Sequence, residues 1–336
     1  MATLIEKRNI YIDLIATNTI QTNPNDRVAT AFNLSQPILH DTTDYKMSVI
    51  RFSINTETLP VFIPTMSTNE DDSTIYSCTM EFNGFLYQQY MIFEPQNTNP
   101  IAPEEKYYVN SYQYVVYLFN KMLQQCIINL GDIVTLPVDT VAPVLFFDVD
   151  SQLCGISINP VNYGFNETDK INIYFNTQLY ALFSTMPAST TYLINGMDFQ
   201  LNNLITTDKS LMVQEYKTIE LWNPVSSLVF TTDRMPIYES ITSPLQVYID
   251  GKLSNNNSGY HFKNILTDFI GNEMIFTPYV QYAPSVFRYM NLRPNSQINS
   301  IDLQVQWINK MTGEMRPLYL VPGGSCSLKL YITKDA

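Results

Sequence analysis

The chain has 336 residues, enough to bury a full hydrophobic core without disulfide bonds. Its 31 acidic and 19 basic residues give a formal net charge of -12, which disfavours contact with nucleic-acid phosphates. Only 15% of the residues are charged and 13% are aromatic, a bias that favours half-buried strands. We therefore expect a β-rich protein with no direct nucleic-acid binding.

Residue types that carry chemistry are scarce. His40 and His261 are the only histidines, too few for a His-rich metal site or a nucleophile, histidine and acid triad. The four cysteines lack C-x-x-C spacing, so we expect them to be reduced and buried. No segment approaches the roughly 20 apolar residues of a membrane span. We predict no catalytic, cofactor-binding or metal site, no cofactor and no enzyme activity.

Two acidic clusters leave alternatives open. Residues 70–72 and the pair Asp148 and Asp150 lack the spaced ligands of a calcium loop, so we interpret them as solvated loop acids. A pair of carboxylates for glycoside hydrolysis is defined by geometry, which the sequence does not display. A carboxylate hydrolase therefore stays as a minor alternative.

In chain order, the first strands are predicted at residues 8–18, 28–34 and 45–54. In the third, the apolar positions change phase after Val49, which predicts a bulge or burial on both faces. Alternating runs around Asn83-Gly84 then predict a hairpin near 76–92.

One long helix is predicted near 111–130, where apolar residues recur at three- and four-residue steps. Ser111 can cap its start and Gly131 can close its end. A short helix near 177–184 should begin at Asn176. Further strands are predicted at 144–149, 153–158, 171–175, 211–213, 218–222, 227–231 and 245–249.

Two alternating strands close the chain, at 301–307 and 326–332. Residues 309–313 break the first strand and Pro322-Gly323-Gly324 supplies a turn before the second, so we expect the two strands to face each other across a turn. This ending predicts an antiparallel β-sandwich. Its expected structural core anchors are Trp307, Leu303, Val305, Leu328 and Leu330.

Five segments follow a recognisable pattern. They are a Pro-containing loop leading into a buried run (NLSQPILHDTTDYKMSVIRFSI, 33–54), a helix between strands (SYQYVVYLFNKML, 111–123), a strand followed by a Leu-rich helix (INIYFNTQLYALFSTMP, 171–187), and closing strands at 221–239 and 282–334. Together they resemble the minor capsid, or penton, proteins of the polinton, adintovirus and virophage group.

This resemblance implies an all-β fold, a jelly-roll β-sandwich with inserted loops and one or two helices. It implies one jelly-roll capsid domain over 1–336, with insertions within 61–204 that are either decorations or a small inserted domain. It also implies a structural virion protein, assembled inside the host cell, that forms homopentamers at the fivefold vertices of an icosahedral capsid and contacts the neighbouring major capsid protein.

The resemblance names no residues of the assembly interface. Two alternatives to the penton remain. One is a major capsid subunit of the same fold, and the other is a receptor-binding or carbohydrate-binding β-sandwich whose aromatic residues stack on sugars.

Overall fold

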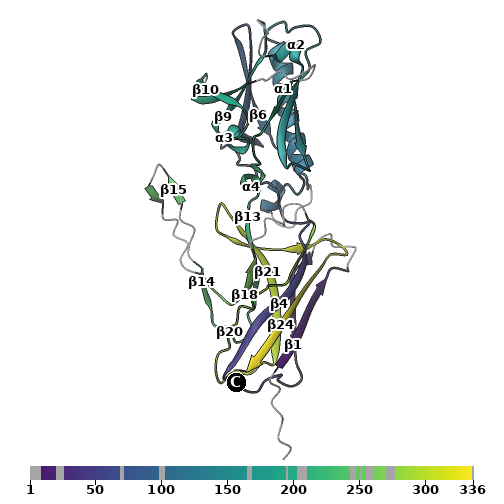
Figure 1. Cartoon of the computed structure of the whole chain (residues 1–336), viewed down its shortest axis with the longest axis vertical. Coiled ribbons are helices and arrows are strands. Elements are labelled where there is room, and N and C mark those ends of the chain that lie inside the picture. Colours follow the sequence, from purple (N-terminus) through teal and green to yellow (C-terminus); the bar gives the residue numbers. More distant parts are fainter. Residues whose placement is uncertain are drawn as a thin grey trace, which may run out of the picture. The chain divides into compact units, whose positions relative to one another are not determined.

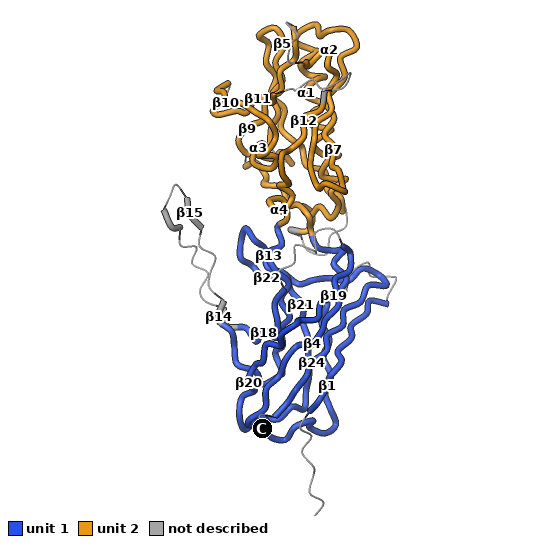
Figure 2. The backbone as a smooth tube through the Cα atoms, viewed as in Figure 1, with its two compact units in different colours: residues 1–59, 224–336 blue, residues 60–223 orange. Residues whose placement is uncertain are grey.

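The computed structural model describes residues 9–19, 26–68, 72–97, 103–164, 169–193, 196–202, 210–242, 247–249, 252–254, 261–269 and 277–334. The chain divides into two compact units (Figure 2). Unit 1 comprises residues 1–59 and 224–336, and unit 2 comprises residues 60–223. Unit 2 is thus inserted into the sequence of unit 1, over a longer span than the 61–204 expected for the insertions.

Unit 1 contains two antiparallel sheets (Figure 1). The first runs in the order β1 (Asn9–Thr17), β24 (Ser325–Lys334), β4 (Tyr45–Asn55) and β19 (Tyr279–Tyr282), with β20 (Met290–Asn291) also paired to β4. The second runs in the order β18 (Ile265–Phe269), β13 (Val225–Thr231) and β21 (Ser300–Asn309), and both β22 (Met315–Pro317) and β3 (Ala29–Asn33) pair with β21.

The strand pairing in unit 1 is that of a jelly roll. Eight strands form four nested pairs. The first and last strands, β1 and β24, pair with each other, and inside them β3 pairs with β21, β4 with β19, and β13 with β18. Such a folded-over ribbon gives two sheets joined by Greek-key connections. Unit 2 lies in the sequence between the third strand, β4, and the fourth, β13.

Aromatic side chains join the two sheets across the core of unit 1. The ring of Phe52 on β4 lies 4.7 Å from that of Phe230 on β13 and 5.4 Å from that of Phe269 on β18. All five expected core anchors are buried, and they come from both sheets.

The closing strands were expected to face each other across a turn. In the structure β21 turns into the short strand β22, whereas β24 pairs with β1 and β4 in the other sheet. The two closing strands therefore do not pair with each other. This part of the prediction was wrong, because alternation shows which side of a strand is buried but not which strand lies beside it.

The predicted irregularity in the third strand is a β-bulge. Lys329 of β24 lies opposite Arg51 and Leu330 lies opposite Val49, so Ile50 has no partner in this ladder. The extra residue reverses the alternation of β4 at the point where the apolar pattern changes phase.

Unit 2 has a core of its own between a helix and two sheets. Helix α1 (Tyr112–Gly131) packs against β5 (Ser73–Phe82), β6 (Phe85–Ile92) and β7 (Val144–Asp148). One sheet has the order β10 (Ala188–Tyr192), β11 (Met197–Leu201), β9 (Asn172–Asn176), β5 and β6, and the other has the order β12 (Ser210–Val213), β8 (Leu153–Ile158) and β7.

Shorter elements complete the chain. They are the helices η1 (Pro103–Tyr107), α2 (Pro160–Tyr163), α3 (Thr177–Leu182) and α4 (Ile219–Trp222), and the strand pairs β2 (Asp26–Arg27) with β23 (Tyr319–Leu320), β14 (Ser240–Thr242) with β17 (His261–Lys263), and β15 (Val247–Ile249) with β16 (Lys252–Ser254).

Several local predictions for unit 2 are confirmed. The hairpin of β5 and β6 turns at Asn83 and Gly84, whose φ angles of 51° and 80° are those of a two-residue turn with both central residues left-handed. The side chain of Asn176 accepts a hydrogen bond from the backbone N–H of Leu179 at 2.9 Å and so caps α3 as expected.

Helix α1 begins and ends where predicted, with Ser111 at its N-cap and Gly131 as its last residue, although the side chain of Ser111 makes no capping hydrogen bond and Gly131 is not a left-handed residue beyond the helix. One local prediction is wrong. The segment predicted as a strand at 218–222 is the helix α4, because the Thr218 hydroxyl and the Trp222 indole N–H both donate to the Leu182 carbonyl oxygen. These contacts with a distant segment favour a helical turn.

The residues of unit 1 that directly precede and follow unit 2 in the sequence form hydrogen bonds with the segment around β22. Before unit 2, the hydroxyl of Thr58 donates to the carbonyl oxygen of Tyr319 at 2.6 Å. After unit 2, the carbonyl oxygen of Pro224 accepts from the backbone N–H of Lys310 at 2.7 Å. Lys310 and Tyr319 flank β22 on its two sides.

Candidate assembly surfaces

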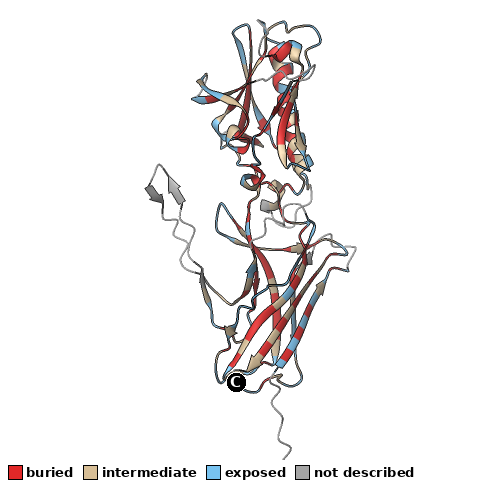
Figure 3. Ribbon diagram, viewed as in Figure 1, coloured by how far each residue is buried: buried red, intermediate tan, exposed pale blue. Residues whose placement is uncertain are grey.

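The outer face of the first sheet of unit 1 carries large apolar side chains. Along β1, buried and exposed residues alternate, so every second side chain points away from the core (Figure 3). Tyr11 is 60% exposed and Ile15 is 67% exposed, with Asp13 between them. This row of β1 adds two large side chains to the outer face of the sheet.

Cross-strand contacts hold this outer face in order. The rings of Tyr11 and Tyr331 stack with their centroids 5.0 Å apart, and Lys329 Nζ lies 3.1 Å from the carboxylate of Asp13. Arg51 Nη2 lies 3.7 Å from the same carboxylate. Exposed pairs of this kind contribute about 0–1 kcal/mol each, so their main effect here is to fix the positions of the side chains.

The second sheet lacks a comparable exposed face over β21. Asp302 and Gln306 point outward by alternation, yet both are buried. The segment after β13 covers Asp302, whose carboxylate accepts from the hydroxyl of Thr232 and from the backbone N–H groups of Asp233 and Arg234 at 2.9 and 3.0 Å. The first sheet is therefore the better candidate for contact with another subunit.

Strand β1 also offers a long edge. Its nine residues pair with β24, and among the described strands β1 ends the sheet. An unpaired edge of this length is a ready template for another chain unless assembly covers it.

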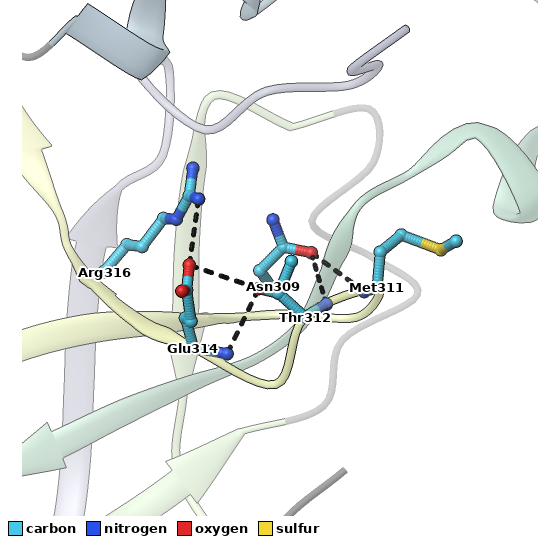
Figure 4. A network of polar contacts seen from close by, with 5 residues as sticks. All are labelled: Asn309, Met311, Thr312, Glu314 and Arg316. Carbon is cyan, nitrogen blue, oxygen red and sulfur yellow. Dashed lines mark hydrogen bonds and ion pairs between the residues drawn. The ribbon is translucent and has the colours of Figure 1, made fainter. Parts of the chain in front are cut away.

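A second candidate contact is the turn between β21 and β22, drawn in Figure 4. The side-chain oxygen of Asn309 accepts from the backbone N–H groups of Met311 and Thr312 at 2.8 and 3.3 Å. Glu314 accepts from Arg316 Nη2 at 3.0 Å, and Arg316 in turn lies over the ring of Trp307. This network fixes the turn and presents Met311, which is 71% exposed.

The chemically reactive side chains are dispersed. Hydrogen bonds from Ser151 hold the pKa of Asp148 below its usual value, as expected for a turn acid, and His40 is exposed. Glu70, Asp71 and the side chain of His261 lie outside the described residues. Within the described ranges, no three side chains of metal-ligating type gather into one group, and no helix is long and apolar enough to cross a bilayer.

All four cysteines are buried free thiols. Burial raises the pKa of Cys154 and of Cys326 to about 12, so both thiols are protonated at neutral pH. They pack as small apolar side chains, in agreement with the sequence expectation.

The fold and the exposed sheet face define a jelly-roll protein of the class that includes viral capsid subunits. The model of one family, the Sputnik minor capsid protein V18/19, matches residues 10–334, and the chain belongs to that family. Among curated proteins, protein V18 of Sputnik virophage is 30% identical over 164 residues, a match that covers 42% of this chain and 93% of V18.

Two solved structures share the fold over nearly the whole chain. A chain in the cryo-EM structure of Sputnik virophage aligns with a TM-score of 0.82 at 23% identity, covering 98% of both chains. The crystal structure of the mavirus penton protein aligns with a TM-score of 0.67 at 17% identity, covering 98% of this chain and all of that chain.

The comparisons confirm the resemblance drawn from the sequence, together with the all-β jelly-roll fold. The protein is a structural component of the virion, of the minor capsid class. No residue of the candidate assembly surfaces described above was identified as such from the sequence. The alternation along β1 was the available signal, but it does not show which outward faces remain uncovered.

Proposed function

We propose that the protein is the penton of an icosahedral capsid, a homopentamer that fills the fivefold vertices and contacts neighbouring major capsid subunits. The observation that carries this proposal is the jelly-roll pairing of unit 1 in a chain of the minor capsid family. The proposed role is structural and requires no reaction centre.

The outer face and free edge of the first sheet are the proposed contact between copies. Five copies related by rotation would use two different patches of each subunit, and closure of the ring would cover edges that otherwise promote aggregation. Tyr11 and Ile15 supply the apolar part of the contact, and Asp13 with its two basic partners supplies the polar rim.

The mass of the purified oligomer tests the proposal. Native mass spectrometry of the full chain should give an assembly of five copies of the 38.6 kDa subunit. A trimer would overturn the penton assignment in favour of a major capsid subunit. A low-resolution image of the assembled particle should place the protein at the vertices.

A variant of β1 tests the interface. Ile15→Asp should convert the pentamer to monomers, because a charge would be buried in the contact. The fold should keep its stability, since Ile15 faces solvent in the isolated chain. Val286→Asp is the matched control, an equally drastic change at a site that is 81% exposed in the same unit. A pentamer that survives Ile15→Asp would refute this choice of surface.

A further inference from the structure

A cavity of about 420 Å³ opens in unit 2, and none of its described lining residues belongs to the contact proposed above. It lies on the sheet formed by β10, β11, β9, β5 and β6, on the face that is turned away from α1. On β6, Gln89 accepts a hydrogen bond from Asn129 of α1, so the alternate residues Gln88 and Tyr90 face the other way and line the cavity. The volume falls within the range of about 300–1,000 Å³ typical of ligand sites.

The lining of this cavity is polar without being basic. Ten described residues line it, and none of them is Lys, Arg or His. Amide and hydroxyl groups come from Gln88, Gln178 and Thr177, each of which both donates and accepts hydrogen bonds. A sugar hydroxyl has the same double capacity, whereas a phosphate, sulfate or carboxylate requires donors and positive charge.

Tyr90 and Asp198 give the cavity the two features that distinguish a sugar site. The ring of Tyr90 is 37% exposed at the cavity wall, where it offers an apolar plane to the C–H face of a pyranose. Asp198 is only 6% exposed and also lines the cavity. Its carboxylate can accept from two neighbouring hydroxyls, while it would repel an anionic ligand.

Hydrogen bonds to the backbone make this wall rigid. The side chain of Asn176 accepts from the backbone N–H of Ser77 at 3.2 Å and donates to the carbonyl oxygen of Ile75 at 2.8 Å. Gln88 Nε2 donates to the hydroxyl of Ser77 at 3.0 Å. Contact groups held in this way lose little freedom when a ligand binds, which favours affinity.

We propose that the cavity binds a neutral oligosaccharide, with one sugar ring on Tyr90 and the hydroxyls of a neighbouring sugar hydrogen-bonded to Asp198, which lies three strands away on the same face of the sheet. The site belongs to unit 2, whose removal would leave every strand pair of the jelly roll intact. Attachment to glycans is thereby separate from assembly, and a failure of one proposal would not decide the other.

A glycan array tests the proposal with the fluorescently labelled full-length protein. The array should carry neutral oligosaccharides and their sialylated and sulfated counterparts. We expect binding to neutral glycans and weaker binding to the anionic forms. An array without neutral hits, or with anionic hits alone, would overturn the proposal.

Variants locate any binding within the cavity. Tyr90→Ala and the nearly isosteric Asp198→Asn should each weaken binding to the best neutral glycan, measured by calorimetry, by about tenfold or more, because the first removes the stacking surface and the second removes a charged hydrogen-bond acceptor. Tyr216→Ala removes an exposed tyrosine elsewhere in unit 2 and should bind normally. Full affinity in both cavity variants, at unchanged thermal stability, would place the sugar elsewhere and refute the site.

Discussion

Replacement of Trp307 tests the architecture of unit 1 most directly. Trp307 is 3% exposed on the inner face of β21, beneath the guanidinium of Arg316. A buried tryptophan removes about 150–250 Å² from water, which at about 25 cal/mol per Å² corresponds to about 4–6 kcal/mol. Because alanine keeps the Cβ atom and the site relaxes in part, we expect Trp307→Ala to lower the free energy of unfolding by about 3–5 kcal/mol.

The distribution of tryptophan makes the assay selective. The chain has two tryptophans, Trp222 in unit 2 and Trp307 in unit 1. In Trp307→Ala and in the milder control Trp307→Phe, fluorescence excited selectively at tryptophan therefore reports on unit 2 alone, while far-UV circular dichroism follows both units. In urea, the dichroism transition of unit 1 should move to a much lower urea concentration in the alanine variant than in the phenylalanine variant. The unfolding transition reported by Trp222 should have the same midpoint in both variants.

Two results would contradict this reasoning. A change below about 0.5 kcal/mol is typical of a surface site, so it would show that Trp307 is outside the core and that the register of β21 is wrong. A Trp222 transition that moves together with the dichroism transition would show that the two units do not have separate cores.

Three further outcomes are expected. Asn176→Ala should cost about 1–3 kcal/mol in urea unfolding, because it removes the cap of α3 and leaves buried backbone groups without partners; a loss below about 0.5 kcal/mol would argue against the cap. Gly84→Ala should cost about 1 kcal/mol through its φ of 80° alone, since open space surrounds its position, and an unchanged melting temperature would exclude that turn. Burial raises the pKa of Cys154 and Cys326 from 9.0 to about 12, so the unfolded thiols ionise first and stability should fall between about pH 9 and 12. Ellman's reagent at pH 8 should react with these thiols only after urea is added, and rapid reaction in the native protein would contradict their burial.

Local patterns predicted the elements that local forces determine. The change of phase in β4 gave the bulge at Ile50, and Asn83-Gly84 gave the hairpin, because each depends on a few adjacent residues. The strand predicted at 218–222 is a helix instead. Its buried residues Ile219 and Trp222 are three positions apart, as on one face of a helix, and hydrogen bonds to Leu182 stabilise this turn.

Contacts between distant segments account for the rest. β1 and β24 pair although they lie at opposite ends of the sequence, and nothing in either strand specifies the other. Asp302 has the polar character of an exposed position but is covered by the segment after β13. The cavity in unit 2 likewise draws Gln88 and Asp198 from strands more than a hundred residues apart, and each alone resembles an ordinary surface residue.

The hydrogen bonds of Thr58 and Pro224 have a consequence for how such chains diversify. Both points where the chain leaves and re-enters unit 1 are hydrogen-bonded to residues that flank β22. An exchange of everything between them would require no strand to be rethreaded. A lineage can therefore replace the whole insert in a single recombination event while every strand pair of unit 1 stays the same.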